Sequence, residues 1–161
     1  MTPESAGDIE VRWEVSKDSD FENVIQSGIF ITGEGQDYTI KVDVTGLEPA
    51  SNYYYRFSSG KKYSPVGRTK TLSDGNIDHV NLGVVSCSNF EFGYFSAYNG
   101  MDNEDLDAIL HLGDYIYEYA PYTYGDSSFV RKHLPAKEII TLQDYRTRYA
   151  CLLYTSPSPR D

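Results

Sequence analysis

The sequence predicts a β-rich module followed by the start of an α/β domain, and three observations support that order. Between residues 11 and 57, short segments alternate apolar and polar side chains, as strands with one buried face do. From Val80 the pattern changes to two short, continuously apolar segments about 20 residues apart, which is typical of parallel strands joined by a crossover. Ser73 to Asn76 separates the two regions with residues typical of a linker.

The strands expected in the first region rest on two signals: alternation marks 11–16 and 38–44, and turn residues bound the apolar or tyrosine-rich segments 25–32 and 53–57. The expected strands cover 11–16, 25–32, 38–44 and 53–57, with a last strand within 64–72. Turns are expected at Gly33 to Gly35 and at Gly46, where glycine interrupts the alternation. We therefore expect an all-β module over residues 1–72 and a linker over 73–78.

The segment VTGLEPASNYYYRF places Leu47 at a strand corner, just before a tyrosine-rich strand. This segment resembles the corner of a fibronectin type III or immunoglobulin-like β sandwich. Such sandwiches carry about seven strands. The sequence marks only five, so we expect the first strand or two to be missing.

The charge balance limits the classes of partner. Asp and Glu number 24 against 14 Lys and Arg, a net charge of −10, which makes a general nucleic-acid surface a poor interpretation. No apolar run reaches the roughly 18 residues of a membrane helix. Residues 1–20 also lack the basic, apolar, small-residue order of a secretory signal. The sequence thus predicts no membrane span and shows no export signal.

The last eleven residues, CLLYTSPSPRD, resemble the translated end of a sequencing adapter. We therefore expect residues 151–161 to be a non-native tail. Of the two cysteines, only Cys87 is then native, and it has no partner for an internal disulfide. Three interpretations stay open for Cys87: a small buried hydrophobe, a metal ligand or a nucleophile.

Residues able to hold a metal follow both apolar segments of the second region. Cys87 follows the first segment, and Gly113 and Asp114 close the second. The carboxyl ends of adjacent parallel strands meet at one edge of a sheet. Tyr117 becomes a neighbour of Asp114 if the chain turns after Gly113. A thiolate, a carboxylate and a phenolate suit a highly charged metal, although each of the three residues alone also fits ordinary packing.

Three longer segments carry a specific resemblance. They are VVSCSNFEFGYFSAY, LDAILHLGDYIYEYAPYTYG and RKHLPAKEIITLQDYRTRYA. Together they resemble the alkaline phosphatase D (PhoD-like) family of metallophosphoesterases. The resemblance implies an N-terminal fibronectin-like sandwich and, over residues 79–150, the N-terminal part of a calcineurin-like phosphoesterase domain.

The resemblance also implies a chemistry and a location. Members hydrolyse phosphate mono- and diesters with a metal-bound hydroxide at a centre of Fe(III) and calcium, and they are secreted, periplasmic or cell-surface proteins. Cys87 and Tyr117 are implied as iron ligands, and Asp114 as a bridge between iron and calcium. The family's later ligands, including a WDDHE-like motif, have no counterpart here. We therefore expect this chain, as a fragment of an active enzyme, to be inactive by itself.

Other polar residues have structural interpretations beside functional ones. We read His111 as a supporting or core histidine rather than a ligand. His133 could approach phosphate together with Arg131 and Lys132. We favour the other interpretation, in which His133 lies in a solvated loop. Thr141 and Asp144 have the spacing of a capping box at a helix start. Asp144 and Arg148 are spaced for an ion pair along that helix.

Two alternative functions remain at this stage. One is a secreted fibronectin-like binding or adhesion module without catalysis, since the β module is the more complete part. The other is a relative of the purple acid phosphatases, which share a sandwich and a GDxxY motif but carry a different first motif from Ser86-Cys87-Ser88. Proximity of Cys87, Asp114 and Tyr117 in space distinguishes a metal centre from a binding module.

Overall fold

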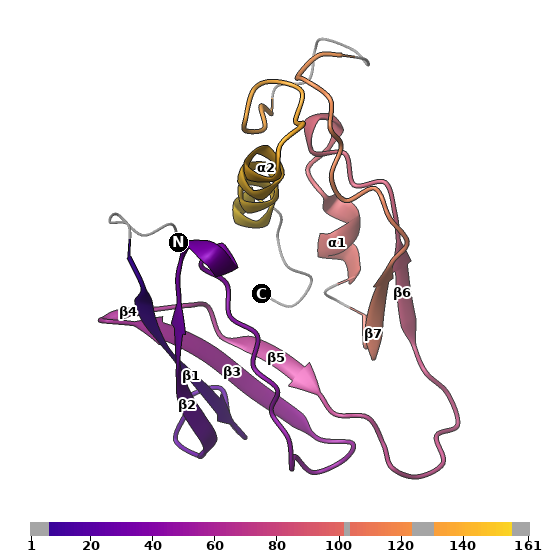
Figure 1. Cartoon of the computed structure of the whole chain (residues 1–161). Coiled ribbons are helices and arrows are strands. Elements are labelled where there is room, and N and C mark those ends of the chain that lie inside the picture. The colour runs from indigo at the N-terminus through magenta and orange to yellow at the C-terminus, as the bar shows by residue number, and fades with distance from the viewer. Residues whose placement is uncertain (1–6, 102–103, 124–130, 156–161) are drawn as a thin grey trace. The chain divides into compact units, whose positions relative to one another are not determined.

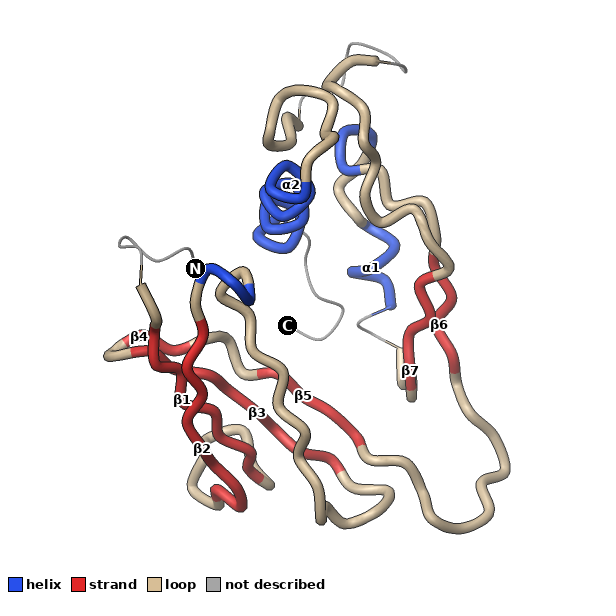
Figure 2. The backbone as a smooth tube through the Cα atoms, viewed as in Figure 1, coloured by secondary structure: helices blue, strands red, loops and turns tan. Residues whose placement is uncertain are grey.

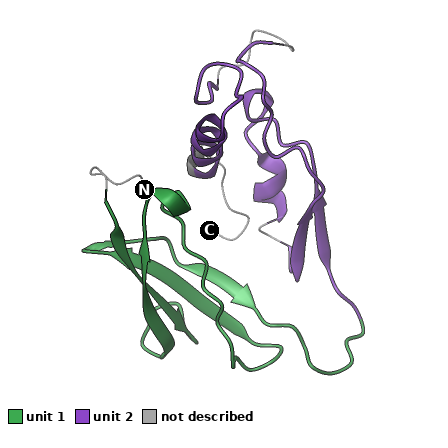
Figure 3. Ribbon diagram, in the orientation of Figure 1, with its two compact units in different colours: residues 1–78, 160–161 green, residues 79–159 purple. Residues whose placement is uncertain are grey.

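The computed structural model describes residues 7–101, 104–123 and 131–155. The chain divides into two compact units, residues 1–78 with 160–161 and residues 79–159 (Figure 3). Within the described residues, no helix combines the length and the apolar character needed to cross a membrane.

One antiparallel sheet forms the first unit (Figures 1 and 2). Strand β1 (Ile9–Ser16) lies in its centre, between β2 (Val24–Thr32) and β3 (Asn52–Ser59). The other edge of β3 pairs with two short strands, β4 (Lys62–Tyr63) and β5 (Gly67–Lys70). A single 3-10 turn, η1 (Glu34–Gln36), follows β2. The strands predicted over 11–16, 25–32 and 53–57 are thus confirmed, and β5 lies within the predicted 64–72.

The strand predicted over 38–44 is wrong. Residues 39–45 are extended but make no ladder with a neighbouring strand among the described residues. Their alternation is nevertheless real, because Val42 and Val44 are half-buried and line a hollow with Trp13 of β1. Alternation reports which side of a segment faces apolar partners, whereas a ladder also requires a second backbone alongside.

A sandwich requires two packed sheets. In the described part of the first unit there is one sheet, and the extended segment 39–45 packs its apolar side chains against it. The fibronectin-like sandwich therefore stays a prediction.

A buried tyrosine fixes the corner before β3. Tyr53 is 1% exposed, and its hydroxyl accepts a hydrogen bond of 2.8 Å from the backbone N–H of Glu48. The Lys17 ammonium lies 4.5 Å from the centre of the Tyr53 ring. A tyrosine hydroxyl bonded to backbone a few residues upstream is the tyrosine corner of β sandwiches. The corner predicted from this segment is therefore present.

The second unit has its elements in the order strand, helix, strand, helix (Figure 1). Strands β6 (Leu82–Val85) and β7 (Ala108–His111) pair in parallel, with Leu82 opposite Ala108 and Val85 opposite His111. The 3-10 turn η2 (Phe90–Phe92) and helix α1 (Ser96–Met101) lie between them, and α2 (Leu142–Thr155) follows. The predicted strand-helix-strand crossover is confirmed. Two strands do not define a calcineurin-like domain, which stays a prediction.

Helix α1 precedes the position that the sequence indicates. The sequence between the two apolar segments has weak helical signals from Met101 to Leu106, whereas α1 ends at Met101 and residues 104–107 are not helical. Aromatic packing explains the shift, because buried Tyr98 on α1 contacts the ring of Phe95, which contacts buried Phe90. Tertiary packing of this kind overrides weak local propensity.

Burial of the two parallel strands is one-sided. Gly83 is buried, and a side chain there would meet Leu106 and Met101. Val84 and Leu110 are 57% and 46% exposed. A continuously apolar run predicts burial on both faces, and in the described residues only one face is covered. The expectation of fully buried strands is therefore wrong for these residues.

Helix α2 begins with the predicted capping box. The Thr141 hydroxyl accepts from the Asp144 N–H at 3.1 Å, and the Asp144 carboxylate accepts from the Thr141 N–H at 3.2 Å. The ion pair expected with Arg148 is replaced by one with Lys137 Nζ, 2.8 Å from Asp144 Oδ1. The helix continues past residue 150, and Leu152 is 3% exposed. The non-native origin of residues 151–161 stays a prediction.

We expect Tyr53→Phe to lower the free energy of unfolding of the first unit by about 1–2 kcal/mol, because the Glu48 N–H loses its acceptor. Urea unfolding followed by the fluorescence of Trp13, the single tryptophan, measures this change. Tyr55→Phe is the matched control, since Tyr55 is 36% exposed, and should cost less than about 0.5 kcal/mol. An equal loss of unfolding free energy in the two variants would show that the hydrogen bond from Glu48 N–H to the Tyr53 hydroxyl does not stabilise the unit.

Candidate metal centre

Backbone pairing continues past the ends of β6 and β7. The Leu112 N–H donates to Val85 O at 2.8 Å, and the Cys87 N–H donates to Gly113 O at 3.0 Å. The Ser88 N–H then donates to the carbonyl oxygen of Asp114 at 2.9 Å. These three bonds hold the two loops side by side, so the residues after both strands lie at one edge of the sheet, as predicted.

Both loops bend through unusual backbone conformations. Cys87 and Asp114 have φ angles of 58° each, in the left-handed region, and Gly113 has φ of 127°. For residues with a side chain, such conformations cost of the order of 1 kcal/mol or more, and they cluster at functional sites. The turn predicted after Gly113 is thus present.

The three predicted ligands come together around one oxygen atom. Cys87 Sγ lies 3.5 Å from Asp114 Oδ2, and Tyr117 Oη also lies 3.5 Å from that oxygen. Donors bound to one ion at about 2.1–2.3 Å stand roughly 3–3.5 Å apart. The spacing of Asp114 Oδ2 to each of its two neighbours therefore fits donors that share a metal.

The three side chains are accessible and differ in chemistry. Cys87 is exposed and forms no disulfide, Asp114 is exposed, and Tyr117 is half-buried. No group of three His, Cys, Asp or Glu residues able to hold a metal occurs among residues 7–101, 104–123 and 131–155. The third side chain close to Asp114 Oδ2 is the Tyr117 phenol.

His111 supports the loops rather than facing the three donors. Its Nδ1 accepts from the Gly113 N–H at 3.2 Å, which places its proton on Nε2, 3.1 Å from Ser88 Oγ. The Ser88 hydroxyl also bonds to the Tyr98 hydroxyl. Gly113 and Ser88 adjoin Asp114 and Cys87, so His111 links the two loops through their neighbours.

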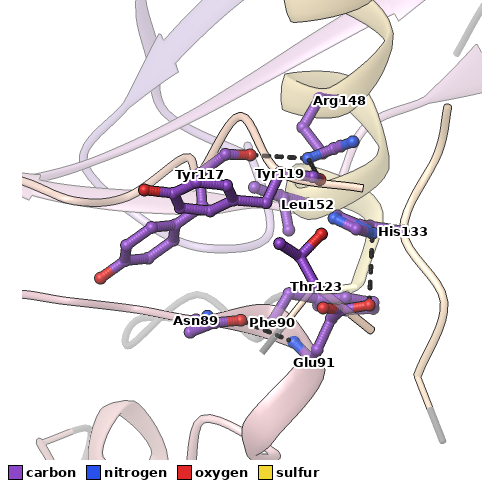
Figure 4. A pocket seen from close by; sticks show the side chains of 9 residues that line it. All are labelled: Asn89, Phe90, Glu91, Tyr117, Tyr119, Thr123, His133, Arg148 and Leu152. Atoms are coloured by element: carbon purple, nitrogen blue, oxygen red, sulfur yellow. Dashed lines mark hydrogen bonds and ion pairs between the residues drawn. The ribbon is translucent and has the colours of Figure 1, made fainter. Parts of the chain in front are cut away.

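A small buried pocket lies beside the Tyr117 segment (Figure 4). Arg148 of α2 lines this pocket and is 1% exposed. The guanidinium donates to the carbonyl oxygens of Tyr117 at 2.6 Å and Tyr119 at 3.4 Å. Burial lowers the pKa of Arg148, while Glu91 is among the groups that oppose the shift. Sequence reasoning assigned Arg148 a helix-surface pair and missed this role.

His133 lines the same pocket and is 6% exposed, so the solvated loop expected for it is wrong. Burial lowers the pKa of His133 to about 4, and the charge of Arg148 acts in the same direction. Its Nδ1 lies 3.7 Å from Glu91 Oε1 and has no hydrogen-bond partner among the described residues. Burial raises the pKa of Glu91, although the Tyr122 N–H and Arg148 oppose that shift.

Arg131 is held by aromatic rings. Its guanidinium carbon lies 4.0 Å from the centre of the Phe90 ring, 4.9 Å from that of Phe95 and 5.1 Å from that of Tyr94. Such contacts with aromatic faces stabilise the cation. Arg131 therefore has a packing role here, and Lys132 is exposed.

Comparison with known proteins assigns a family. The family model named PhoD-like phosphatase, N-terminal domain, matches residues 1–73. The family model named PhoD-like phosphatase matches residues 82–158. Alkaline phosphatase D of Bacillus subtilis (strain 168) is 45% identical over 145 residues, which are 88% of this chain and 25% of that protein. The solved structure titled "Structure of PhoD" matches with a TM-score of 0.88 and 42% identity.

That structural match covers 94% of this chain and 29% of the solved one. This chain therefore spans about a quarter of the length of the relatives that it matches. The chain belongs to the PhoD-like phosphatase family, a family of phosphoesterase hydrolases, as its motifs indicated.

We expect the second unit to lose stability as the pH falls from about 6.5 to about 4. In this window the unfolded chain protonates His133, whereas burial keeps the folded side chain neutral. Lys137 lowers the pKa of Asp144, so protonation of Asp144 also destabilises the folded unit at lower pH. The raised pKa of Glu91 has the opposite effect, because Glu91 takes up its proton more readily in the folded unit than in the unfolded chain. His133 contributes about 3 kcal/mol at most to this loss of unfolding free energy.

Urea unfolding monitored by helix circular dichroism at a series of pH values measures this dependence. His133→Gln should flatten it, whereas exposed His79→Gln should leave it unchanged. An identical pH dependence in both variants would contradict the role given to His133.

Proposed function

We propose that Cys87, Asp114 and Tyr117 are ligands of a metal centre that hydrolyses phosphate esters in the intact enzyme. The observation that carries this proposal is the distance of 3.5 Å from Asp114 Oδ2 to both the Cys87 sulfur and the Tyr117 hydroxyl. Strain at Cys87 and Asp114 supports it, because left-handed backbone at two residues that share a contact is costly without a functional return.

The phenolate is a hard oxygen donor that suits a highly charged ion, and the carboxylate can bridge that ion to a second cation. We assign the Cys87 thiolate and the Tyr117 phenolate to Fe(III), and the Asp114 carboxylate to a bridge between Fe(III) and calcium. Such ions, when bound, polarise phosphate oxygens and activate water. The chain's part is to hold the donors in place, with Asp114 Oδ2 within 3.5 Å of both the Cys87 sulfur and the Tyr117 hydroxyl.

Charge explains why cations are needed. The chain carries a net charge of −10, and Asp114 would repel a phosphate ester approaching it. Among the described residues, the buried guanidinium of Arg148 is directed to backbone carbonyls and that of Arg131 to aromatic rings. Bound cations would therefore offset the repulsion at the site.

The remaining features of the intact enzyme follow from the family. We propose phosphate mono- and diesters as substrates, a fibronectin-like sandwich before a calcineurin-like domain, and a secreted, periplasmic or cell-surface location. The tyrosine corner at Tyr53 and the parallel β6–β7 pair support the two domain assignments.

We expect the chain to bind Fe(III) and to develop a phenolate-to-iron absorption band. Tyr117→Phe should abolish the band, while Cys87→Ser and Asp114→Asn should each weaken binding, because each removes a donor. Anaerobic titration with Fe(III) followed by visible absorption measures both effects.

Two variants of the same residue types serve as controls. Tyr122→Phe and Cys151→Ser alter a tyrosine and a cysteine outside the three donors and should leave the titration unchanged. An absorption band that survives Tyr117→Phe, or that disappears equally with Tyr122→Phe, would refute the ligand assignment.

We expect the 161-residue chain to show no phosphatase turnover with added Fe(III) and calcium. Three donors leave an ion with an incomplete shell and no defined position for a second one. Release of nitrophenol from nitrophenyl phosphate and from its bis ester tests this, with a full-length PhoD-like enzyme as the positive control. Turnover comparable to that of the control would show that three donors suffice.

A further inference from the structure

The Arg148 side chain joins three parts of the second unit. Its Nη1 bonds to the carbonyls of Tyr117 and Tyr119, at 2.6 and 3.4 Å. Its Nη2 donates to Pro135 O at 2.9 Å and Lys137 O at 3.0 Å, and its Nε donates to Leu134 O at 3.0 Å. Helix α2 is thereby tied to the segment that follows Asp114 and to the segment before the helix.

The segment after Asp114 is held at consecutive residues. Arg148 binds the carbonyls of Tyr117 and Tyr119, and the Ile139 N–H donates to the intervening Glu118 carbonyl at 2.9 Å. Ile139 is 2% exposed, so this bond is also protected from water. The backbone from which the Tyr117 phenol extends is therefore fixed from two sides.

Helix α2 also supports the residue next to Asp114. The ring of Tyr149, one residue after Arg148, lies 5.7 Å from that of Tyr115, edge to face. The Tyr115 ring in turn lies 5.5 Å from His111. The helix thus contacts the segment after Asp114 at Tyr115, Tyr117 and Tyr119.

Only arginine suits this arrangement. Its planar group presents five N–H donors in fixed directions, and here Nε, Nη1 and Nη2 reach acceptors on two separate segments. A lysine ammonium presents three donors from one point and cannot span both segments. At 1% exposure, donors left without carbonyls would have no water to replace them.

We propose that Arg148 is a positioning residue that sets the Tyr117 phenol beside Asp114 for metal binding. The guanidinium does not contact the three donors. It acts through the Tyr117 carbonyl, as groups around a metal site orient its ligands. This inference rests on the function proposed above for Cys87, Asp114 and Tyr117.

The test compares Arg148→Lys and Arg148→Met with the wild-type chain. Fe(III) affinity should fall about 10- to 100-fold in both variants, the usual effect of losing a group that orients a ligand. The phenolate-to-iron band should weaken at saturating iron. Amide exchange at residues 117–119 should accelerate, measured without metal, while helix circular dichroism confirms that each variant is folded. Arg148→Met leaves no buried charge and carries the test if Arg148→Lys does not fold.

Arg56→Lys is the matched control. Arg56 is a partly buried arginine of the first unit whose Nε donates to Glu14 at 2.8 Å, so its loss removes a partly buried ion pair of that unit. It should leave Fe(III) affinity and the band unchanged.

The outcomes separate the two proposals. Unchanged Fe(III) affinity and an unchanged band in folded Arg148 variants overturn the positioning role, even if amide exchange accelerates, because the role would then be structural only. Failure of the wild-type chain to bind Fe(III) overturns the proposed function. It also overturns the proposal that Arg148 positions Tyr117 for metal binding.

Discussion

The parallel register of β6 and β7 is the constraint on which the candidate site depends. Because Val85 lies opposite His111 and the bonds continue to Gly113 and Asp114, two residues 27 positions apart arrive at neighbouring points in space. A shift of this register would separate the Cys87 sulfur from the Asp114 carboxylate.

A second constraint is the buried charge of Arg148. Burial of a cation costs several kcal/mol unless polar groups replace its water. Five backbone carbonyls do so here, and the Glu91 and Asp144 carboxylates further favour the charged form. The site segment and helix α2 are therefore coupled by a group that tolerates little displacement, because any carbonyl that moves away leaves a desolvated N–H.

Sequence reasoning succeeded where short-range patterns decide the outcome. Alternation located β1, apolar and aromatic segments bounded by turn residues located β2 and β3, apolar runs located β6 and β7, and the spacing of Thr141 and Asp144 marked the start of α2. The proximity of Cys87, Asp114 and Tyr117 was also predictable, because the ends of parallel strands meet at one edge. Family membership followed from the motifs that contain these residues.

Sequence reasoning failed where contacts between residues distant in the sequence determine the local structure. The segment 39–45 has the alternation of a strand but no backbone partner among the described residues, and α1 is set by the rings of Phe90, Phe95 and Tyr98. Arg148 looked like a surface partner of Asp144, because its carbonyl acceptors lie 11–31 residues away. No local spacing reveals such acceptors.

The left-handed backbone at Cys87 and Asp114 has a further consequence for the evolution of this fold. Glycine would adopt these conformations without strain, so the fold alone would favour glycine at the two positions where donors stand. If Cys87 and Asp114 are the ligands proposed above, stability and ligand supply are opposed at both residues, because glycine would relieve the backbone strain and remove a donor.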